Sequence, residues 1–307
     1  MSENVLITPA DLAPMLGKPD VVVPDVVVPD VVVIDTRAPT AFAEGHIPGA
    51  VNIHDIFTYL ATSTPQGMSE LKQKFADIFG AAGLGGSQTA IFYEGSMDSG
   101  FGQSCRGYFL LKFLGYPKAL VLHGGFAAWR AAGLPVSTDP AAATPAKFPL
   151  VDTGTAMMIG RDEMLAALDD DAIVKLDVRD VDEWVGTSSS PYGPDFCPRK
   201  GRIPGSKWIE WYRLMKPSAA GPMFKSPDEI MAECHSVGIT KSTPVYLFCF
   251  KGARASNTLV ALKEAGIEDV RLYFGSFNEW SRDPALPVES GPPWAPIAHT
   301  KLAQAAE

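Results

Sequence analysis

Residues 243–266 read TPVYLFCFKGARASNTLVALKEAG. The short apolar run from Pro244 to Phe248 predicts a buried strand, and the apolar residues at helical spacing after it predict a helix from Ser256 to Ala265. Cys249 then lies at the carboxyl end of the strand, at the start of a loop, 249–254, that leads into the helix. The first N–H groups of a helix have no intrahelical acceptors, so we expect them to point into this loop.

The loop surrounds Cys249 with groups that favour a thiolate. Unpaired N–H groups, the positive end of the helix and the cations of Lys251 and Arg254 all stabilise negative charge on sulfur. Gly252 lets the backbone amides turn inward at low steric cost. A buried structural cysteine is the alternative, since free cysteines are often buried. The order of strand, cysteine, glycine-bearing loop, arginine and helix favours a thiol that is nucleophilic at neutral pH.

Three further motifs occur once in each half of the chain. The copies are Asp35–Arg37 and Asp177–Arg179, Gly45–Ala50 and Gly201–Ser206, and Gly124–Trp129 and Gly275–Trp280. Trp129 and Trp280 are 151 positions apart, which indicates an internal duplication. Strands that alternate with helices predict an α/β fold with a parallel central sheet in each half. The expected strands include Val31–Ile34, Thr89–Tyr93, Ala119–Leu122, Ile173–Leu176 and Val270–Tyr273.

Together, the Cys249 loop and the repeated motifs resemble those of the rhodanese-type sulfurtransferases over nearly the whole chain. The resemblance implies two tandem rhodanese-like domains that move a sulfane sulfur from thiosulfate, or a related donor, through a Cys249 persulfide to cyanide or a thiol. Cys249 is the expected catalytic residue. The expected substrate-binding residues are Phe250, Lys251, Gly252, Ala253, Arg254 and Arg202. Structural support is expected from Asp177, Arg179, Asp35 and Arg37.

The loop defines the sulfur donor less sharply. A lysine two places after the cysteine resembles the thiosulfate-using members of the family more than the 3-mercaptopyruvate enzymes. However, Glu183 stands where tandem members commonly carry a substrate arginine, so either Arg199 or Arg202 replaces it or the natural donor differs from both standard ones. A 3-mercaptopyruvate sulfurtransferase and a non-enzymatic persulfide carrier or interaction module are the alternatives. A cysteine phosphatase is disfavoured, because four residues rather than five separate Cys249 from Arg254.

The first half lacks the cysteine. Glu94 occupies the position of Cys249, where a carboxylate would repel an anionic donor, and Cys105 is expected on the following helix. We therefore expect the first half to be catalytically silent. The second half alone carries a polar insertion, 186–199, which is expected to form a wall of the cleft. A role for its Cys197 as a second sulfur carrier is a weaker hypothesis.

Composition suggests where the domains begin and end. We expect an N-terminal domain at 1–137, a proline- and alanine-rich linker at 138–154, a catalytic domain at 155–296 and a tail at 297–307. The sequence PDVVV is written three times between Pro19 and Val33. The last copy is the expected central strand, because Pro24 and Pro29 would interrupt a ladder. The earlier copies are interpreted as an extended excursion.

The 307 residues carry a net charge of −9 and 46% hydrophobic content, which is typical of a two-domain globular protein with no surface for nucleic acid or membrane. The residues MSENVLITPADLAPMLG lack the apolar core of a secretory signal, and the four cysteines show no disulfide or metal spacing. The cytoplasm is the expected compartment. No metal or cofactor is expected. The expected partners are a small sulfur donor and a thiophilic acceptor, with an acceptor protein as an alternative.

Overall fold

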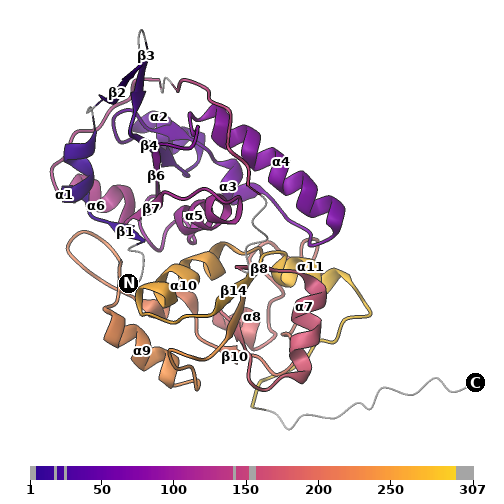
Figure 1. Cartoon of the computed structure of the whole chain (residues 1–307). Coiled ribbons are helices and arrows are strands. Elements are labelled where there is room, and N and C mark those ends of the chain that lie inside the picture. The colour runs from indigo at the N-terminus through magenta and orange to yellow at the C-terminus, as the bar shows by residue number, and fades with distance from the viewer. Residues whose placement is uncertain (1–4, 17–18, 24–25, 141–142, 152–156, 295–307) are drawn as a thin grey trace, which may run out of the picture.

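The computed structural model describes residues 5–16, 19–23, 26–140, 143–151 and 157–294. It contains two five-stranded parallel sheets, one in each half of the chain. Figure 1 shows the first half, in indigo to magenta, above the second half, in pink to yellow. The predicted α/β fold with a parallel sheet in each half is confirmed. The tail predicted at 297–307 lies outside the described residues, and the domain limits stay a prediction.

The first sheet has the strand order β1-β7-β6-β4-β5. Its strands and the helices between them are β1 Leu6–Ile7, α1 Pro9–Leu12, the 3-10 helix η1 Ala13–Met15, β4 Val31–Asp35, α2 Pro39–Glu44, β5 Val51–Asn52, α3 Asp55–Thr58, α4 Pro65–Ala81, β6 Thr89–Tyr93, α5 Gln103–Phe113, β7 Ala119–Leu122 and α6 Gly125–Ala131. Thr8 and Thr64 accept backbone N–H groups at the starts of α1 and α4, which are also helped by a proline in the first turn.

The second sheet has the strand order β10-β9-β13-β14-β8. Its elements are β8 Met158–Ile159, α7 Arg161–Ala166, η2 Ala167–Asp169, β9 Val174–Asp177, α8 Val181–Trp184, β10 Lys207–Trp208, η3 Trp211–Leu214, β11 Met215–Lys216, β12 Met223–Phe224, α9 Pro227–His235, β13 Val245–Phe248, α10 Ala253–Glu264, β14 Val270–Tyr273 and α11 Ser276–Arg282. Strands β11 and β12 form a separate antiparallel pair. Among the described residues, no helix is both long and apolar enough to cross a membrane.

The three copies of PDVVV form two different structures, a strand of the first sheet and a separate hairpin. The third copy provides β4, which pairs with β5 and β6 in the middle of the first sheet. The two earlier copies provide β2 Pro19–Val23 and β3 Val26–Pro29, which pair with each other in an antiparallel hairpin that projects from the sheet (Figure 1). The strand prediction for the last copy is confirmed, and the excursion proves to be a hairpin.

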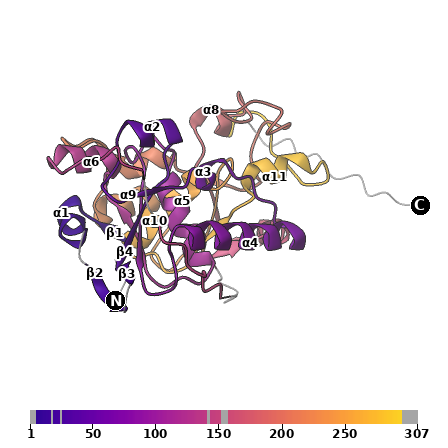
Figure 2. The ribbon, with the colours of Figure 1, turned by 90° about the horizontal axis from the view of Figure 1, so that it is seen from above.

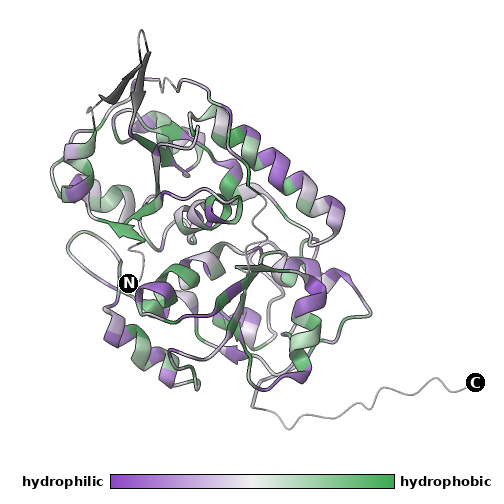
Figure 3. Cartoon of the chain, in the orientation of Figure 1, coloured by the Kyte–Doolittle hydropathy of each residue, from purple (hydrophilic) through white to green (hydrophobic). Residues whose placement is uncertain are grey.

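Each sheet is covered on both faces, because neighbouring residues of a strand point to opposite sides. In β6, Ala90 and Phe92 pack with α4 and α5, whereas Ile91 and Tyr93 pack with α1, α2 and α6. In Figure 3, hydrophilic (purple) and hydrophobic (green) residues alternate along α4, as expected for an amphipathic helix with one face on the sheet and one in solvent. Strands buried on both faces explain the continuous apolar runs that predict them.

The two halves share one interface, in which α5 lies against α10 (Figure 1). Phe109 of α5 stacks on Phe274 with 5.4 Å between ring centroids. One apolar cluster runs from the first half into the second. At the edge, Ser63 donates its backbone N–H and its hydroxyl to Glu279, where α4 approaches α11 (Figure 2). The halves therefore form a continuous packed unit, and residues of both can line one site.

Candidate active site

Cys249 lies between the end of β13 and the start of α10, with no exposed surface. The N–H of Gly252 donates to its Sγ at 3.1 Å. Gly252 has a left-handed φ of 86° and caps α10, so the helix begins at Ala253 rather than at the predicted Ser256. Arg254 is therefore part of the first helical turn. Of the loop amides expected to hold the sulfur, the one from Gly252 makes a hydrogen bond to Sγ.

The closing motif Gly275–Trp280 holds the cysteine loop in place through hydrogen bonds to its backbone. The hydroxyl of Ser276 accepts the N–H of Cys249 at 3.2 Å, while the N–H groups of Phe277 and Asn278 donate to the carbonyls of Cys249 and Phe250. Ser276 takes a left-handed φ of 54°, an unusual conformation for a residue with a side chain. The motif thus has a positioning role that its spacing alone does not reveal.

Arg254 does not point a free charge at the sulfur. Its NH1 and NH2 atoms donate to Glu183 at 2.6 and 3.1 Å, and NH1 also lies 3.0 Å from Asp180. Burial alone would lower the pKa of Arg254, but the charge and hydrogen bonds of Glu183 raise it well above its usual value. Glu183 thus occupies the guanidinium, and the role of Arg254 in binding the donor stays a prediction.

A cluster of three carboxylates stands next to Arg254. Asp180, Asp182 and Glu183 bring oxygens within 4.8 Å of one another. Because Arg254 already binds two of them, this cluster serves the guanidinium and gives no ground for a metal ion.

Lys251 is the loop cation best placed to bind an anionic donor, because it lines the cavity beside Cys249. Its Nζ lies 3.8 Å from the ring centroid of Phe57, from the first half, and 5.1 Å from that of Tyr192. Burial lowers its pKa to about 7, with Arg106 and Arg254 adding to the effect and Cys249 opposing it. The ammonium is thus held by aromatic faces instead of a carboxylate, and about half of it is protonated at neutral pH.

Arg106, on α5 of the first half, is a site residue that the sequence motifs do not identify. Its guanidinium donates to the carbonyls of Ile56, Phe57 and Tyr59 and lies 4.6 Å from the Phe274 ring centroid. Burial lowers its pKa to about 10, while the charge of Cys249 is the largest factor that raises it. Only the packing of α5 against α10 brings this cation to the sulfur, so a long-range contact carries the information.

Beside Cys249 lies a small cavity of about 20 Å³. Its walls are Phe57 and Phe101 of the first half, Pro191 and Tyr192 of the insertion, and the loop residues Cys249, Phe250, Lys251, Ala253 and Arg254. The predicted wall role of the insertion is confirmed. Such a space holds roughly one water molecule, so it accommodates one added sulfur atom on Sγ. A larger donor has to displace Phe101 or Tyr192, both of which are 42% exposed.

The other predicted site residues lie elsewhere. Arg199 donates to carbonyls around Trp280 and Leu286, and Arg202 binds Glu289 and stacks on Trp184. Both arginines hold the loops of the second half together, so the prediction that either replaces the family arginine, and that Arg202 binds substrate, is not supported by this geometry.

Cys197 does not face the cleft. It is fully buried in an apolar cluster, and burial raises its pKa to about 11. An inert thiol of this kind cannot readily carry sulfur.

The Asp-x-Arg motifs form ion pairs at strand ends, and their structural role stays a prediction. In the second half, Arg179 makes a two-pronged ion pair with Asp177 and donates to the carbonyl of Gly201. Asp35 and Arg37 repeat the arrangement in the first half, with Gly45 as the carbonyl acceptor. Asp177 is in register with Phe248, the residue before Cys249, so the pair lies next to the active loop.

Glu94 is fully buried at the equivalent strand end of the first half. Its carboxylate accepts the N–H of Gln103 at 2.9 Å and the hydroxyl of Ser104 at 3.1 Å. Burial raises its pKa to about 8. A carboxyl group that is mostly neutral at pH 7 thus stands where the second half has its sulfur, and the catalytic silence of the first half stays a prediction.

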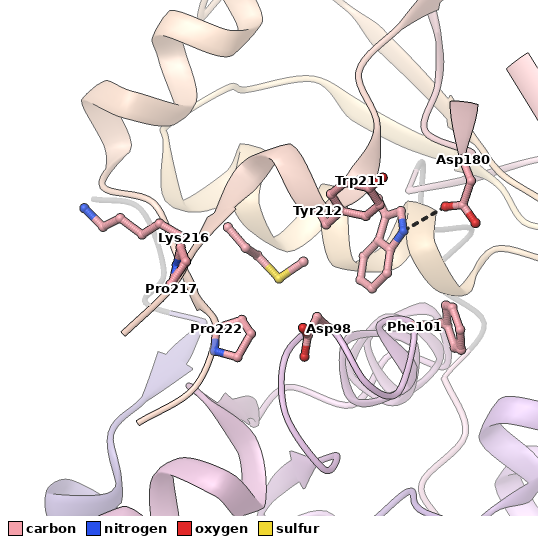
Figure 4. A pocket seen from close by; sticks show the side chains of 9 residues that line it. Asp98, Phe101, Asp180, Trp211, Tyr212, Lys216, Pro217 and Pro222 are labelled. Carbon is pink, nitrogen blue, oxygen red and sulfur yellow. Dashed lines mark hydrogen bonds between the residues drawn. The ribbon is translucent and has the colours of Figure 1, made fainter. Parts of the chain in front are cut away.

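A larger pocket of about 400 Å³ adjoins the site between the two halves. Figure 4 shows Asp98 and Phe101 of the first half facing Trp211 and Tyr212 of the second. The remaining walls are Asp180, Met215, Lys216, Pro217 and Pro222. The Nε1 of Trp211 donates to Asp180 at 3.2 Å, and Phe101 belongs to the walls of both cavities.

Comparisons with known proteins agree with this geometry. The Rhodanese-like domain family matches residues 8–132 and 160–283. The chain is 29% identical over 286 residues to a thiosulfate sulfurtransferase of Azotobacter vinelandii, covering 92% of this chain and 96% of that protein. It is 30% identical over 280 residues to a protein of Synechococcus elongatus named as a thiosulfate sulfurtransferase by inference, covering 84% of this chain and 80% of that one.

Among solved structures, the fold is similar to that of an anaerobic ergothioneine biosynthesis enzyme from Chlorobium limicola in complex with trimethyl histidine. The TM-score is 0.78 at 23% identity, over 94% of this chain and 71% of that chain. The two family matches cover most of the sequence and coincide with the two sheets. The chain therefore belongs to the rhodanese-like family and is a sulfurtransferase with two copies of that domain.

Proposed function

We propose that this sulfurtransferase takes the outer sulfur of thiosulfate onto Cys249 and passes it to cyanide or to a thiol. The Cys249 thiolate attacks the outer sulfur, the bond between the two sulfurs of thiosulfate breaks, and its electron pair leaves with sulfite. The product on the protein is a Cys249 persulfide anion. An acceptor then removes the outer sulfur and returns the thiolate, which completes a two-step cycle.

The environment of Sγ is the observation that carries the proposal. The sulfur sits at the amino end of α10 with one N–H donor at 3.1 Å, and the helix end favours an anion there. Among the described residues, neither Lys251 nor Arg106 has a carboxylate within ion-pair distance. The site therefore has unpaired positive charge beside the nucleophile, which suits an anionic sulfur donor.

Thiosulfate is the donor that the site favours over 3-mercaptopyruvate. Lys251 stands in the loop two places after the cysteine, and relatives in Azotobacter vinelandii and Pseudomonas aeruginosa are named for thiosulfate. Lys251 lines the cavity beside Cys249, where it can contact a compact dianion, and the buried Arg106 of the other half adds positive charge near the sulfur. Arg254 contributes less, because Glu183 neutralises it.

Intact-mass spectrometry tests the nucleophile. Incubation with thiosulfate should give a species one sulfur atom heavier, together with one equivalent of sulfite, and Cys249→Ser should give neither. Cys197→Ala is the matched control, since it removes another thiol of the same half and should still load. If Cys249→Ser forms thiocyanate from thiosulfate and cyanide at the parental rate, the assignment of the nucleophile is wrong. Parallel turnover of thiosulfate and 3-mercaptopyruvate tests the donor.

A further inference from the structure

The pocket between Phe101 and Trp211 is not used by the sulfur-loading step. It adjoins the sulfur site through two shared features. The ring of Phe101 stands between the cavities, 6.4 Å from the Phe57 centroid on one side and 5.9 Å from that of Trp211 on the other. Asp180 lines the larger pocket and contacts Arg254, which lines the smaller one. Only the side chain of Phe101 thus separates a molecule in the larger pocket from the cavity that would hold the persulfide.

The silent half supplies part of this pocket through a longer loop. In the second half three residues separate Cys249 from the start of α10, whereas in the first half Glu94 is followed by eight residues before α5 begins. Asp98 and Phe101 lie in that longer loop and reach the opposite half. Phe101 holds a left-handed φ of 54°, a conformation that a bulky residue rarely adopts and that marks functional positions. The longer loop therefore builds a wall that the sulfur site itself does not require.

The lining selects a particular kind of ligand. Its volume of about 400 Å³ suits a small molecule. Phe101, Trp211 and Tyr212 offer aromatic faces, and Tyr212 is 45% exposed. Of the charged side chains, Lys216 is engaged by Glu229 at 2.7 Å and Asp180 by Arg254 at 3.0 Å, whereas Asp98 has a serine hydroxyl as its partner. Aromatic faces beside the Asp98 carboxylate favour a cation and disfavour an anion.

We propose that this pocket binds the sulfur acceptor, and that the acceptor is a small thiol with an aromatic or apolar body and a positively charged group. The proposal rests on the persulfide cycle described above. The thiol sulfur of the acceptor attacks the outer sulfur of the Cys249 persulfide, and the bond from that sulfur to Sγ breaks. The electron pair returns to Sγ as the thiolate, and the proton of the acceptor thiol goes to the outgoing persulfide. Movement of Phe101 opens the path.

Single-turnover discharge of the loaded protein tests the pocket. Protein carrying the persulfide, verified by intact mass, is mixed with 4-(aminomethyl)thiophenol, 4-(hydroxymethyl)thiophenol or 4-mercaptobenzoate, which differ in charge. Each rate is divided by the rate of the same thiol with a small disulfide in solution, which removes differences in thiol reactivity. We expect the cationic thiol to discharge the protein about tenfold faster than the anionic one, from the reversal of one charge beside the exposed Asp98 carboxylate.

Variants locate the effect. Asp98→Asn should remove most of the preference, because Asp180 is already paired with Arg254. Tyr212→Ala should lower the rate of all three aromatic thiols relative to cyanide by about fivefold, and Tyr212→Phe should restore it. Asp77→Asn, an exposed carboxylate on α4, is the matched control and should change neither ratio.

Two outcomes overturn the proposal. Equal corrected rates for the three thiols exclude charge selection, and an unchanged ratio in Tyr212→Ala excludes the pocket. Binding of 4-methylbenzylamine, measured by calorimetry on the unloaded protein, separates the pocket from the chemistry. If no persulfide forms but this amine binds and Tyr212→Ala abolishes the binding, the donor assignment fails and the pocket stands. If persulfide forms and the amine does not bind, the pocket fails alone.

Discussion

The alkaline limb of the sulfur-loading step should report the ionisation of Lys251. Because burial lowers the pKa of Lys251 to about 7, its ammonium is lost as the pH rises through neutrality. Thiosulfate stays fully ionised over this range, so the donor itself does not titrate. With a pKa of about 7, roughly a tenth of the amine is protonated at pH 8 and a hundredth at pH 9. We expect kcat/KM for sulfite release to fall by about these factors, since kcat/KM reports ionisations of the free enzyme.

Stopped-flow sulfite release from thiosulfate in a single turnover is the assay, because no acceptor takes part. Lys251→Arg is the decisive comparison, since arginine stays protonated throughout. Its profile should lack the decline above pH 7. Lys251→Met should show a low rate without that limb. A decline of the same size and midpoint in wild type and Lys251→Arg would refute the reasoning, because another group would then be responsible for it.

Three further predictions concern stability and packing. Glu183→Gln leaves Arg254 with a partly exposed partner only, so thermal denaturation should show a loss of about 3 kcal/mol, and an unchanged Tm would contradict the pairing. Gly102→Ala should cost about 1–3 kcal/mol, because a Cβ there lies 2.6 Å from the Cβ of Asn257 and Gly102 has a φ of 78°. It should show as a lower denaturation midpoint, whereas Gly133→Ala, also at positive φ but with open space around it, should cost less. For Glu94, the raised pKa of about 8 means that the native state binds one more proton than the unfolded state between about pH 4.5 and 8. Stability should therefore fall as the pH rises through that window, and Glu94→Gln should remove this part of the slope in Tm against pH. Parallel slopes in the two proteins would argue against a neutral native carboxyl.

Local patterns predict much of the fold because strands buried on both faces leave an unmistakable apolar run. Strands β6, β7 and β14 lie at the residues that their sequences predict. The start of α10 is misplaced by three residues, since the glycine cap at Gly252 stabilises the helix earlier than its apolar spacing shows. The hairpin of β2 and β3 is also not predictable from propensity, because identical repeats give no reason for one pairing over another.

Some residues of the candidate site are likewise predictable from local sequence, whereas others are brought to it only by the packing of the two halves. Cys249, Lys251 and Gly252 follow from one contiguous loop, so sequence alone brings them together. Arg106 and Phe57 reach the sulfur through the packing of one half on the other, for which no local pattern exists. The pairing of Arg254 with Glu183 links positions 71 residues apart. The sequence shows that Glu183 replaces an expected arginine, but only the fold shows what the replacement does.

Phe57 of the first half covers the amine of Lys251 in the second half, so the packing of the two halves affects the protonation of this lysine. Any motion that draws the halves apart readmits water to the amine, and hydration favours the ammonium. The packing of Phe57 on Lys251 therefore couples the contact between the two halves to the pKa of one lysine.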